Sequence, residues 1–302
     1  MTILVLMATH NGLPFLPEQV QSIRNQQGVT VRILAYDDQS TDTTAQWLDA
    51  NGIERLPTRA ERLGPAGAFI HLLLHAPIGD ADAIALADQD DLWDPKKLAL
   101  QRELLHRTPA LAGVSSNVMA FWPDGRERYI DKGVAPTSHD HLLEAAGPGC
   151  TYMVSRSFLE SLRAVWAGQG IEALESLVRG RPYHDWLLYA CARAMGWQWT
   201  MLAQPLVHYR QHANNVFGVH DGWHGKWARL MELRAGSFQE RQFELVSYVS
   251  KIALNPYASE WLCIAHAKGV FARFRRARWL LAARRRRSEG WMLAVCALLG
   301  IW

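Results

Sequence analysis

The chain has 302 residues, which is long enough for one large domain or a domain with an appended segment. Because 49% of them are apolar, we expect a substantial core rather than global disorder. Its net charge of only +3 argues against a nucleic-acid binder. The four cysteines are far apart and form no C-x-x-C pair, which argues against a disulfide framework or a zinc site and fits a reducing cytosol. Neither a secretory leader nor an apolar run of bilayer length is apparent, so we expect a cytoplasmic protein.

Strand and helix patterns alternate over the first part of the chain. Continuous apolar runs predict strands buried on both faces, at residues 3–8, 31–36, 83–87 and 111–116. Helical spacing of apolar residues predicts helices between them, at 16–23, around Trp47 and Leu48, at 66–75 and after Pro95. This order predicts an α/β fold with a Rossmann-like, mostly parallel sheet flanked by helices.

The remaining chain has a mixed pattern and then a helical one. Helices are predicted near 160–166 and 186–195, and short strands at 197–202 and 205–210. Beyond Trp223 the chain reads as helical and increasingly basic. We therefore expect an α/β domain over residues 1–218, with halves 1–116 and 117–218, followed by a C-terminal helical extension over 219–302.

Three carboxylates in four residues follow the third predicted strand: Asp88, Asp90 and Asp91. Crowded carboxylates resist ionising together unless a cation or strong hydrogen-bond donors compensate. A hard divalent cation such as Mg²⁺ or Mn²⁺ supplies that compensation and prefers oxygen ligands. The alternative is an acidic loop that is simply solvated. The loop also leads from a strand towards the helix opened by Pro95, where open α/β sheets bind their ligands.

Polar clusters also follow the first two strands, at Thr9-His10-Asn11 and at Asp37-Asp38. The carboxyl ends of parallel strands meet on one sheet edge, so all three clusters are expected to line one crevice. A carboxylate after the second strand can accept hydrogen bonds from a base or a ribose, and a metal at the third cluster can neutralise a diphosphate. Without G-x-G-x-x-G or G-K-[ST], a dinucleotide dehydrogenase or a phosphate-loop NTPase is disfavoured. The pattern instead indicates a nucleotide diphosphate used as a leaving group.

The three clusters resemble the signatures of family 2 glycosyltransferases, which have the GT-A fold. The matching segments are Ala8 to Gly12, Asp37 to Asp42 and Asp88 to Trp93. The resemblance covers residues 2–218 and is nearest to bacterial rhamnosyltransferases of polysaccharide assembly. Their H-D-W and Y-R-Q-H-x-N-N motifs are similar to residues 184–186 and 209–215. The chain departs from the pattern at Ala213, where glycine is common, and at Arg62, where the family's N-x-G loop has asparagine.

The resemblance implies a metal-dependent, inverting glycosyltransferase. Such an enzyme would move a sugar, for example L-rhamnose from dTDP-rhamnose, to a hydroxyl of a glycan or lipid-linked saccharide in bacterial surface polysaccharide synthesis. Residues 1–116 would form the nucleotide-sugar-binding half and 117–218 the acceptor-side half. Two alternatives are a sugar nucleotidyltransferase, which would release pyrophosphate, and a non-catalytic sugar- or membrane-binding scaffold with the same fold.

The resemblance also assigns roles on the donor side. Nucleotide-sugar contacts fall to Thr9, Asn11, Asp37, Asp38, Asp88 and Gln89. Asp90 would bind the cation, magnesium or manganese, that acts as a Lewis acid on the diphosphate, and His212 would be a second ligand or a diphosphate donor. Asp91 either ligates the cation or caps the following helix.

Asp185 occupies the family's catalytic base position on the acceptor side. The alternative is that Asp185 caps the helix running to Met195. The remaining acceptor- or diphosphate-side candidates are Trp93, Thr151, His184, Trp186 and Arg210. Cys150, in a segment similar to the family's G-x-T loop, is interpreted as a small packed residue.

The basic C-terminal segment has an apolar helical face made by Val270, Phe274, Ala277 and Leu281, with arginines along its border. Such a face can lie on a membrane surface and attract anionic lipid, at the inner side of the cytoplasmic membrane. The alternative is a helix packed on the catalytic domain or on a homodimer partner, with its arginines in solvent.

Overall fold

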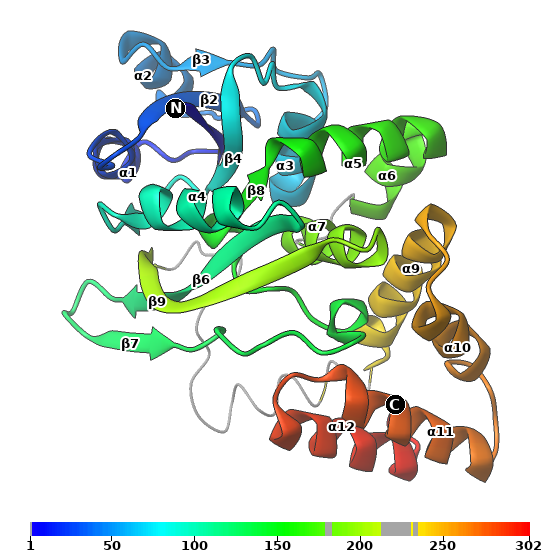
Figure 1. The fold of residues 1–302 in the computed structure, drawn as a ribbon. Coiled ribbons are helices and arrows are strands. Elements are labelled where there is room, and N and C mark those ends of the chain that lie inside the picture. Colours follow the sequence, from blue (N-terminus) through cyan, green and yellow to red (C-terminus); the bar gives the residue numbers. More distant parts are fainter. Residues whose placement is uncertain (1, 179–182, 213–230, 232–234) are drawn as a thin grey trace. The chain divides into compact units, whose positions relative to one another are not determined.

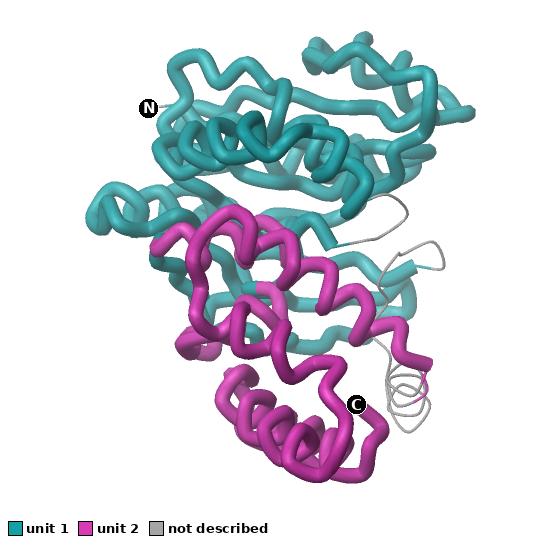
Figure 2. The backbone as a smooth tube through the Cα atoms, turned by 90° about the vertical axis from the view of Figure 1, so that its right-hand side faces the viewer, with its two compact units in different colours: residues 1–133, 146–185, 197–216 teal, residues 134–145, 186–196, 217–302 magenta. Residues whose placement is uncertain are grey.

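The computed structural model describes residues 2–178, 183–212, 231 and 235–302. The chain falls into two compact units (Figure 2). The first unit comprises residues 1–133, 146–185 and 197–216, and the second comprises 134–145, 186–196 and 217–302. The second unit therefore includes two segments from the middle of the chain. The domain boundary expected at residue 218 lies outside the described residues.

The first unit is built on one mixed sheet, with strand order β3-β2-β1-β4-β8-β6-β9-β5 and β7 beside β6 (Figure 1). Its strands are β1 (Thr2–Thr9), β2 (Thr30–Asp37), β3 (Glu54–Arg55), β4 (Ala81–Ala87), β5 (Leu92–Trp93), β6 (Leu111–Phe121), β7 (Glu127–Ile130), β8 (Met153–Ser155) and β9 (Gln198–Arg210).

The four strands from β3 to β4 are parallel, as the alternating strand and helix patterns predict. Beyond them the sheet is mixed. The short strand β8 lies between β4 and β6 and is antiparallel to both, while β6 and β9 are parallel. The strand predicted at 111–116 is present in β6, but β8 separates it from β4 because a later part of the chain enters the sheet there.

Helices cover both faces of this sheet. They are α1 (Leu16–Arg24), α2 (Thr44–Ala50), α3 (Gly64–His75), α4 (Lys97–Arg107), α5 (Arg156–Gln169) and α6 (Ile171–Val178), with a 3-10 turn η2 (Gly149–Thr151). Leu16 of α1, Leu48 of α2 and Leu98 of α4 pack with Val5 and Met7 of β1 in one buried core. The helix α3 contacts β1 outside this core. Cover on both faces explains why β1 and β4 read as continuous apolar runs.

Two local differences from the sequence expectations bear on the site. The acidic residues do not lead directly into a helix, because β5 pairs with β9 first and α4 begins only at Lys97. The two short strands expected at 197–202 and 205–210 form one strand, β9, whose pairing with β6 shifts near Asn117. Asn117 Nδ2 donates to the Ala203 carbonyl (2.8 Å) at that irregularity, so a side chain replaces the missing ladder bond.

The second unit is helical, as expected for the C-terminal extension. Its elements are η1 (Asp140–Leu142), most of α7 (His184–Ala194), α9 (Ser237–Ile252), α10 (Pro256–Ile264), α11 (Val270–Ala283) and α12 (Arg287–Leu299). Trp261 of α10 and Trp279 of α11 pack with ring centroids 4.3 Å apart. Within the described ranges, no helix combines the length and apolar character needed to cross a bilayer.

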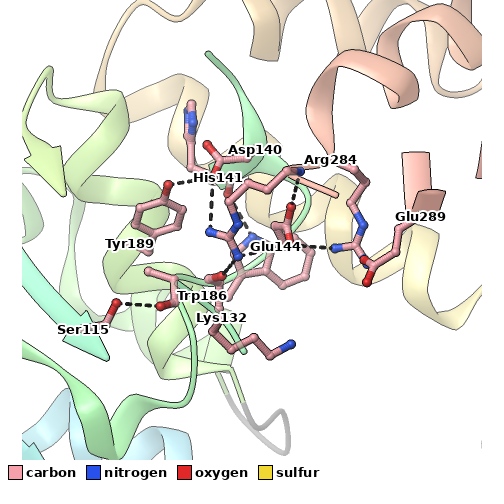
Figure 3. A network of polar contacts seen from close by, with 12 residues as sticks. Ser115, Lys132, Asp140, His141, Glu144, Trp186, Tyr189, Arg284 and Glu289 are labelled. Carbon is pink, nitrogen blue, oxygen red and sulfur yellow. Dashed lines mark hydrogen bonds and ion pairs between the residues drawn. The ribbon is translucent and has the colours of Figure 1, made fainter. Parts of the chain in front are cut away.

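A buried ionic network ties η1 to the link between α11 and α12 (Figure 3). Asp140, with no exposed side-chain surface, accepts a hydrogen bond from Tyr189 (2.8 Å) and pairs with Arg285 (3.2 Å). Arg284 and Arg285 both pair with Glu144 at 3.1 Å. Part of the C-terminal arginine run is therefore internal to this unit rather than solvated.

Candidate functional site

The three polar clusters lie at the carboxyl ends of neighbouring strands. Thr9 ends β1 and pairs in register with Asp37 at the end of β2, and β4 runs parallel to β1 on its other side. The order β3-β2-β1-β4 with parallel strands is the arrangement in which open α/β sheets form a ligand crevice. The sequence expectation of a common edge is therefore met by the geometry of the sheet.

Asp37 and Asp38 are buried and shape the loops around this edge. Thr9 Oγ1 donates to Asp37 Oδ1 (2.9 Å), and the Ser40 amide donates to its other oxygen (3.0 Å). The two oxygens of Asp38 accept from the amides of Leu63 and Gly64, each at 2.7 Å. These carboxylates thus hold the β1, β2 and α3 loops together at the place where a nucleotide contact is expected.

The loop held by Asp38 also borders a pocket. Arg62, which stands where the family pattern has asparagine, lies 3.6 Å from Asp38 through Nε. Residues 59–63 line a cavity of about 230 Å³ together with His71 of α3 and Glu175 of α6. This cavity therefore lies beside the loop whose Leu63 amide Asp38 holds.

Gln89 joins the loops that follow β1 and β4. Its side-chain oxygen accepts from the His10 amide (2.8 Å), and its nitrogen donates to the His10 carbonyl (3.1 Å). Gly12 makes room for this amide, since a Cβ there would lie 2.1 Å from Gln89 Oε1. Asn11, with φ of +49°, accepts from the Thr41 amide (2.7 Å) and so fixes the same loop to the one after β2. Both residues order the donor-side loops.

Asp91 is the innermost residue of the acidic loop and has no exposed surface. One oxygen accepts from the Arg210 amide (3.2 Å), while the other has no hydrogen-bond partner among the described residues. Burial first, and then the charges of Asp90 and Asp88, raise the pKa of its carboxyl well above the usual range. Because α4 begins at Lys97, Asp91 does not cap that helix.

Asp88 connects the acidic loop with the proposed base. Burial raises the pKa of Asp88 to about 7, and the charges of Asp90 and Asp185 add to the rise. Repulsion between carboxylates falls off with distance, so Asp185, at the start of α7, shares one electrostatic site with Asp88. The fold has therefore brought residues about a hundred positions apart into the same neighbourhood.

Asp90 and His212 meet directly, with Asp90 Oδ2 2.8 Å from His212 Nε2. Both side chains are 14% exposed, so a ligand can reach them. The His212 ring stacks on Phe15 of the loop before α1, with centroids 4.5 Å apart and planes at 16°. Arg210 Nε donates to the Asp90 carbonyl (2.9 Å), which fixes the backbone of the acidic loop against β9.

Two sets of side chains around this loop could hold a cation. Ligand atoms of Asp88, Asp91 and Cys150 lie within 4.8 Å of one another. However, Asp91 and Cys150 are fully buried, and burial raises the pKa of the Cys150 thiol, which keeps its proton. Asp90 with His212 is the accessible set and offers the oxygen and nitrogen donors that Mg²⁺ or Mn²⁺ accepts. The crowded carboxylates and the direct contact of Asp90 with His212 fit a cation at this loop.

Lys97 is a buried residue near the acidic loop that the sequence reasoning missed. Its ammonium is fully buried and lies 3.7 Å from the centroid of the Trp93 ring. Burial lowers the pKa of Lys97 to about 7, while Cys150 and Asp91 act in the opposite direction. The available signal was its position on the apolar face of α4, one residue before Leu98 and four before the buried Gln101. When protonated, the Lys97 ammonium interacts favourably with the Asp91 carboxylate of the acidic loop.

His184 precedes the proposed base and is packed on both sides. Its ring stacks on Phe69 of α3 with centroids 4.1 Å apart, and a Cβ at Gly149 would lie 2.4 Å from its Nε2. Neither ring nitrogen has a hydrogen-bond partner in the part of the chain that the structure describes, and burial lowers the pKa of His184 to about 3. A neutral, immobile His184 therefore fixes the start of α7 and with it Asp185.

The other acceptor-side candidates are mostly buried. Trp93 and Thr151 are at most 4% exposed, and Thr151 Oγ1 donates to the Pro148 carbonyl (2.7 Å). Trp186 belongs to the second unit, where its indole donates to the His141 carbonyl (2.9 Å). These side chains act through packing in this structure, whereas Arg210 reaches the acidic loop. The motif residues 213–215 lie outside the described residues.

Solved structures define the class of this fold. A structure of S. aureus TarS, residues 1–349, aligns over 100% of this chain and 81% of that chain, with a TM-score of 0.55 and 14% identity. The same protein in complex with UDP-GlcNAc aligns over 100% and 89%, with a TM-score of 0.55 and 11% identity. The fold is a GT-A glycosyltransferase fold, as the sequence motifs predicted.

Sequence comparison defines the family. Residues 4–161 match the model of glycosyl transferase family 2. The dTDP-rhamnosyl transferase RfbG of Shigella flexneri is 34% identical over 230 residues, which is 74% of this chain and 78% of that relative. The chain therefore belongs to glycosyl transferase family 2 and is a glycosyltransferase. The resemblance stated from the motifs is confirmed, and membership favours sugar transfer over the nucleotidyltransferase and scaffold alternatives.

Proposed function

We propose that this glycosyltransferase is a metal-dependent, inverting enzyme. It transfers L-rhamnose from dTDP-rhamnose to a hydroxyl of a glycan or lipid-linked saccharide in bacterial surface polysaccharide synthesis. The name of the Shigella relative supports the donor. The observation that carries the mechanism is the 2.8 Å contact of Asp90 with His212 in the acidic loop, and the repulsion between Asp88 and Asp185 supports placing the candidate base near that loop.

The donor side is formed by the loops that Asp38 and Gln89 hold together. Thr9, Asn11 and Asp37 would fix the edge that binds the nucleoside. Each Asp38 oxygen accepts one amide hydrogen bond and keeps a lone pair for a base or ribose donor. Asp90 and His212 would hold the cation. When bound, Mg²⁺ or Mn²⁺ neutralises the charge that develops on the departing diphosphate.

The acceptor side needs a base opposite the leaving group. As the acceptor oxygen bonds to the anomeric carbon, the bond from that carbon to the diphosphate oxygen breaks, and Asp185 takes the hydroxyl proton. Attack from the face opposite the diphosphate inverts the configuration at the anomeric carbon. His184, held between Phe69 and Gly149, positions Asp185 for this transfer.

Asp185→Asn tests the base. The variant should bind the donor as the wild type does and lose transfer by about 10²-fold or more, because an amide cannot take the proton. Donor binding by calorimetry and product formation by chromatography measure the two effects, and Asp124→Asn, on an exposed turn, is the matched control. Transfer at the wild-type rate would remove Asp185 as the base.

Asp90→Asn tests the cation site. We expect loss of both donor hydrolysis and transfer, together with loss of the response to added Mg²⁺ or Mn²⁺. Full metal-dependent turnover in this variant would contradict the assignment.

A panel of sugar nucleotides scored for hydrolysis identifies the donor. NMR of the product gives the configuration at the anomeric carbon, and a retained configuration would exclude the inverting mechanism.

A further inference from the structure

The helix α12 exposes an apolar stripe from Trp291 to Leu299. Five large side chains, each between 38% and 66% exposed, form this α12 stripe: Trp291, Met292, Val295, Leu298 and Leu299. Their spacing is that of a single helix face, and the opposite face is packed through Leu293, Ala294 and Ala297. A helix face of this kind in water marks a surface that binds a partner.

The neighbouring helix α11 combines exposed apolar and basic side chains. Val270, Phe271 and Phe274 are 66%, 89% and 59% exposed, and the exposed Arg275 and Arg278 lie among them. The apolar face of Val270, Phe274, Ala277 and Leu281 that the sequence predicted is therefore only partly exposed. Its first turns are exposed, while Ala277 is buried.

Charge on these two helices is mostly positive, although Arg275 lies 3.9 Å from Glu260 of α10 and Arg284 pairs with Glu289. Residues 270–302 contain eight arginines and a single carboxylate, Glu289. Arg284 and Arg285 belong to the buried ionic network. Arg273 Nη1 donates to the Leu298 carbonyl (3.4 Å), so a guanidinium stands directly at the end of the α12 stripe.

We propose that the exposed faces of α11 and α12 dock on an anionic lipid bilayer. The apolar side chains enter the acyl boundary and the arginines pair with anionic headgroups. Neither helix spans the bilayer, because α11 has 14 residues and α12 has 13, so each is only about 20 Å long. A second copy of the chain is a poorer occupant, since a two-fold contact would bring the same arginines face to face. Docking would hold the transferase beside a lipid-linked acceptor, and this consequence rests on the proposed function.

Vesicle flotation with the full chain tests this proposal. We expect strong binding to vesicles of phosphatidylcholine with one third phosphatidylglycerol, weak binding to phosphatidylcholine alone, and release at high salt. The variants Val295→Gln with Leu299→Gln, and Arg275→Gln with Arg278→Gln, should each reduce partitioning about tenfold. All four residues are exposed, so the fold should persist, and circular dichroism checks it.

The matched control is Arg107→Gln with Arg126→Gln, which removes the same charge from exposed positions of the first unit. Equal binding to neutral and anionic vesicles would overturn the proposal, as would wild-type binding by both helix variants. A dimer in sedimentation that the Val295 and Leu299 variant abolishes, without any vesicle binding, would assign the face to a second copy. No donor is present in these assays, so their outcome is independent of the proposed activity.

Discussion

At the scale of single residues, the candidate site is shaped by contacts between loops as well as by the motif carboxylates. Gln89 is part of the acidic motif, yet its amide is engaged with the backbone of His10. Asp38 likewise uses both oxygens to hold Leu63 and Gly64. Motif residues in this family member therefore keep the crevice in shape before any ligand enters, which preorganises the site.

Gly12→Ala should disturb this arrangement. The new methyl group would lie 2.1 Å from Gln89 Oε1, so the amide must move and lose its two bonds to His10. We expect KM for the donor to rise about tenfold while kcat changes less, since loop geometry rather than the base is altered. Steady-state kinetics with varied donor measures this. Gln89→Ala is the partner variant: if the clash is the cause, the double variant is no worse than Gln89→Ala alone.

The pH dependence of stability should carry a contribution from His184. Its folded pKa of about 3 lies below the unfolded value near 6.5, so the unfolded chain takes up the proton first. The stability is present above about pH 6.5 and is lost as the pH falls towards 3. At pH 5 the loss from this residue should be about 2 kcal/mol relative to pH 7.5.

Urea unfolding at both pH values measures this loss. In His184→Leu the decrease should be smaller by that amount, whereas His106→Leu, at an exposed position of α4, should behave like the wild type. An unchanged pH dependence in His184→Leu would mean that the buried imidazole is protonated in the folded protein.

At the scale of elements, the link between α11 and α12 is fixed by Arg285. Its side chain is 4% exposed and pairs with Asp140 and Glu144. Arg285→Met would remove the nearer of the two guanidinium groups that pair with Asp140 and one of the two that pair with Glu144, at a cost of about 3 kcal/mol in this buried place. Arg275→Met, 60% exposed and 3.9 Å from Glu260, should cost less than about 0.5 kcal/mol. Equal costs in denaturant titrations would show that the network contributes nothing.

The elements differ in how far the sequence determined them. β1, β2 and β4 were predictable because burial on both faces leaves a continuous apolar run, and the adjoining polar clusters followed from the chain alone. β5 and β8, with two and three residues, are too short for a pattern and exist only through pairing with β9 and with β4 and β6. Lys97 was missed because lysine side chains are usually exposed. Its burial against the Trp93 ring arises only in the tertiary fold.

At the scale of the whole molecule, each of the two units is built from several separate segments of the chain. Residues 134–145 and 186–196 lie in the second unit although the first unit surrounds them in sequence. In that unit Gln242 donates to the Leu142 carbonyl (3.1 Å), and Asn255 lies 3.1 Å from His141. The midchain segments thus depend on helices near the C-terminus.

A chain truncated after residue 218 should therefore fail to fold properly. It would expose the buried Asp140, Leu142 and Tyr189 without the helices that cover them. We expect aggregation or an early urea midpoint, measured by light scattering and circular dichroism against the full chain. A truncated protein with the full chain's unfolding midpoint would contradict this expectation.

The pairing of Asp140 with Arg285 joins positions 145 residues apart. During synthesis at about 5–20 residues per second, the carboxylate emerges roughly 7–30 s before its guanidinium partner. The strands from β1 to β4 can pair during that interval, whereas the second unit must wait for the last part of the chain. Only a chain synthesised beyond Arg285 can form this pair. A chain that terminates earlier would leave Asp140 and the residues around it accessible to proteases.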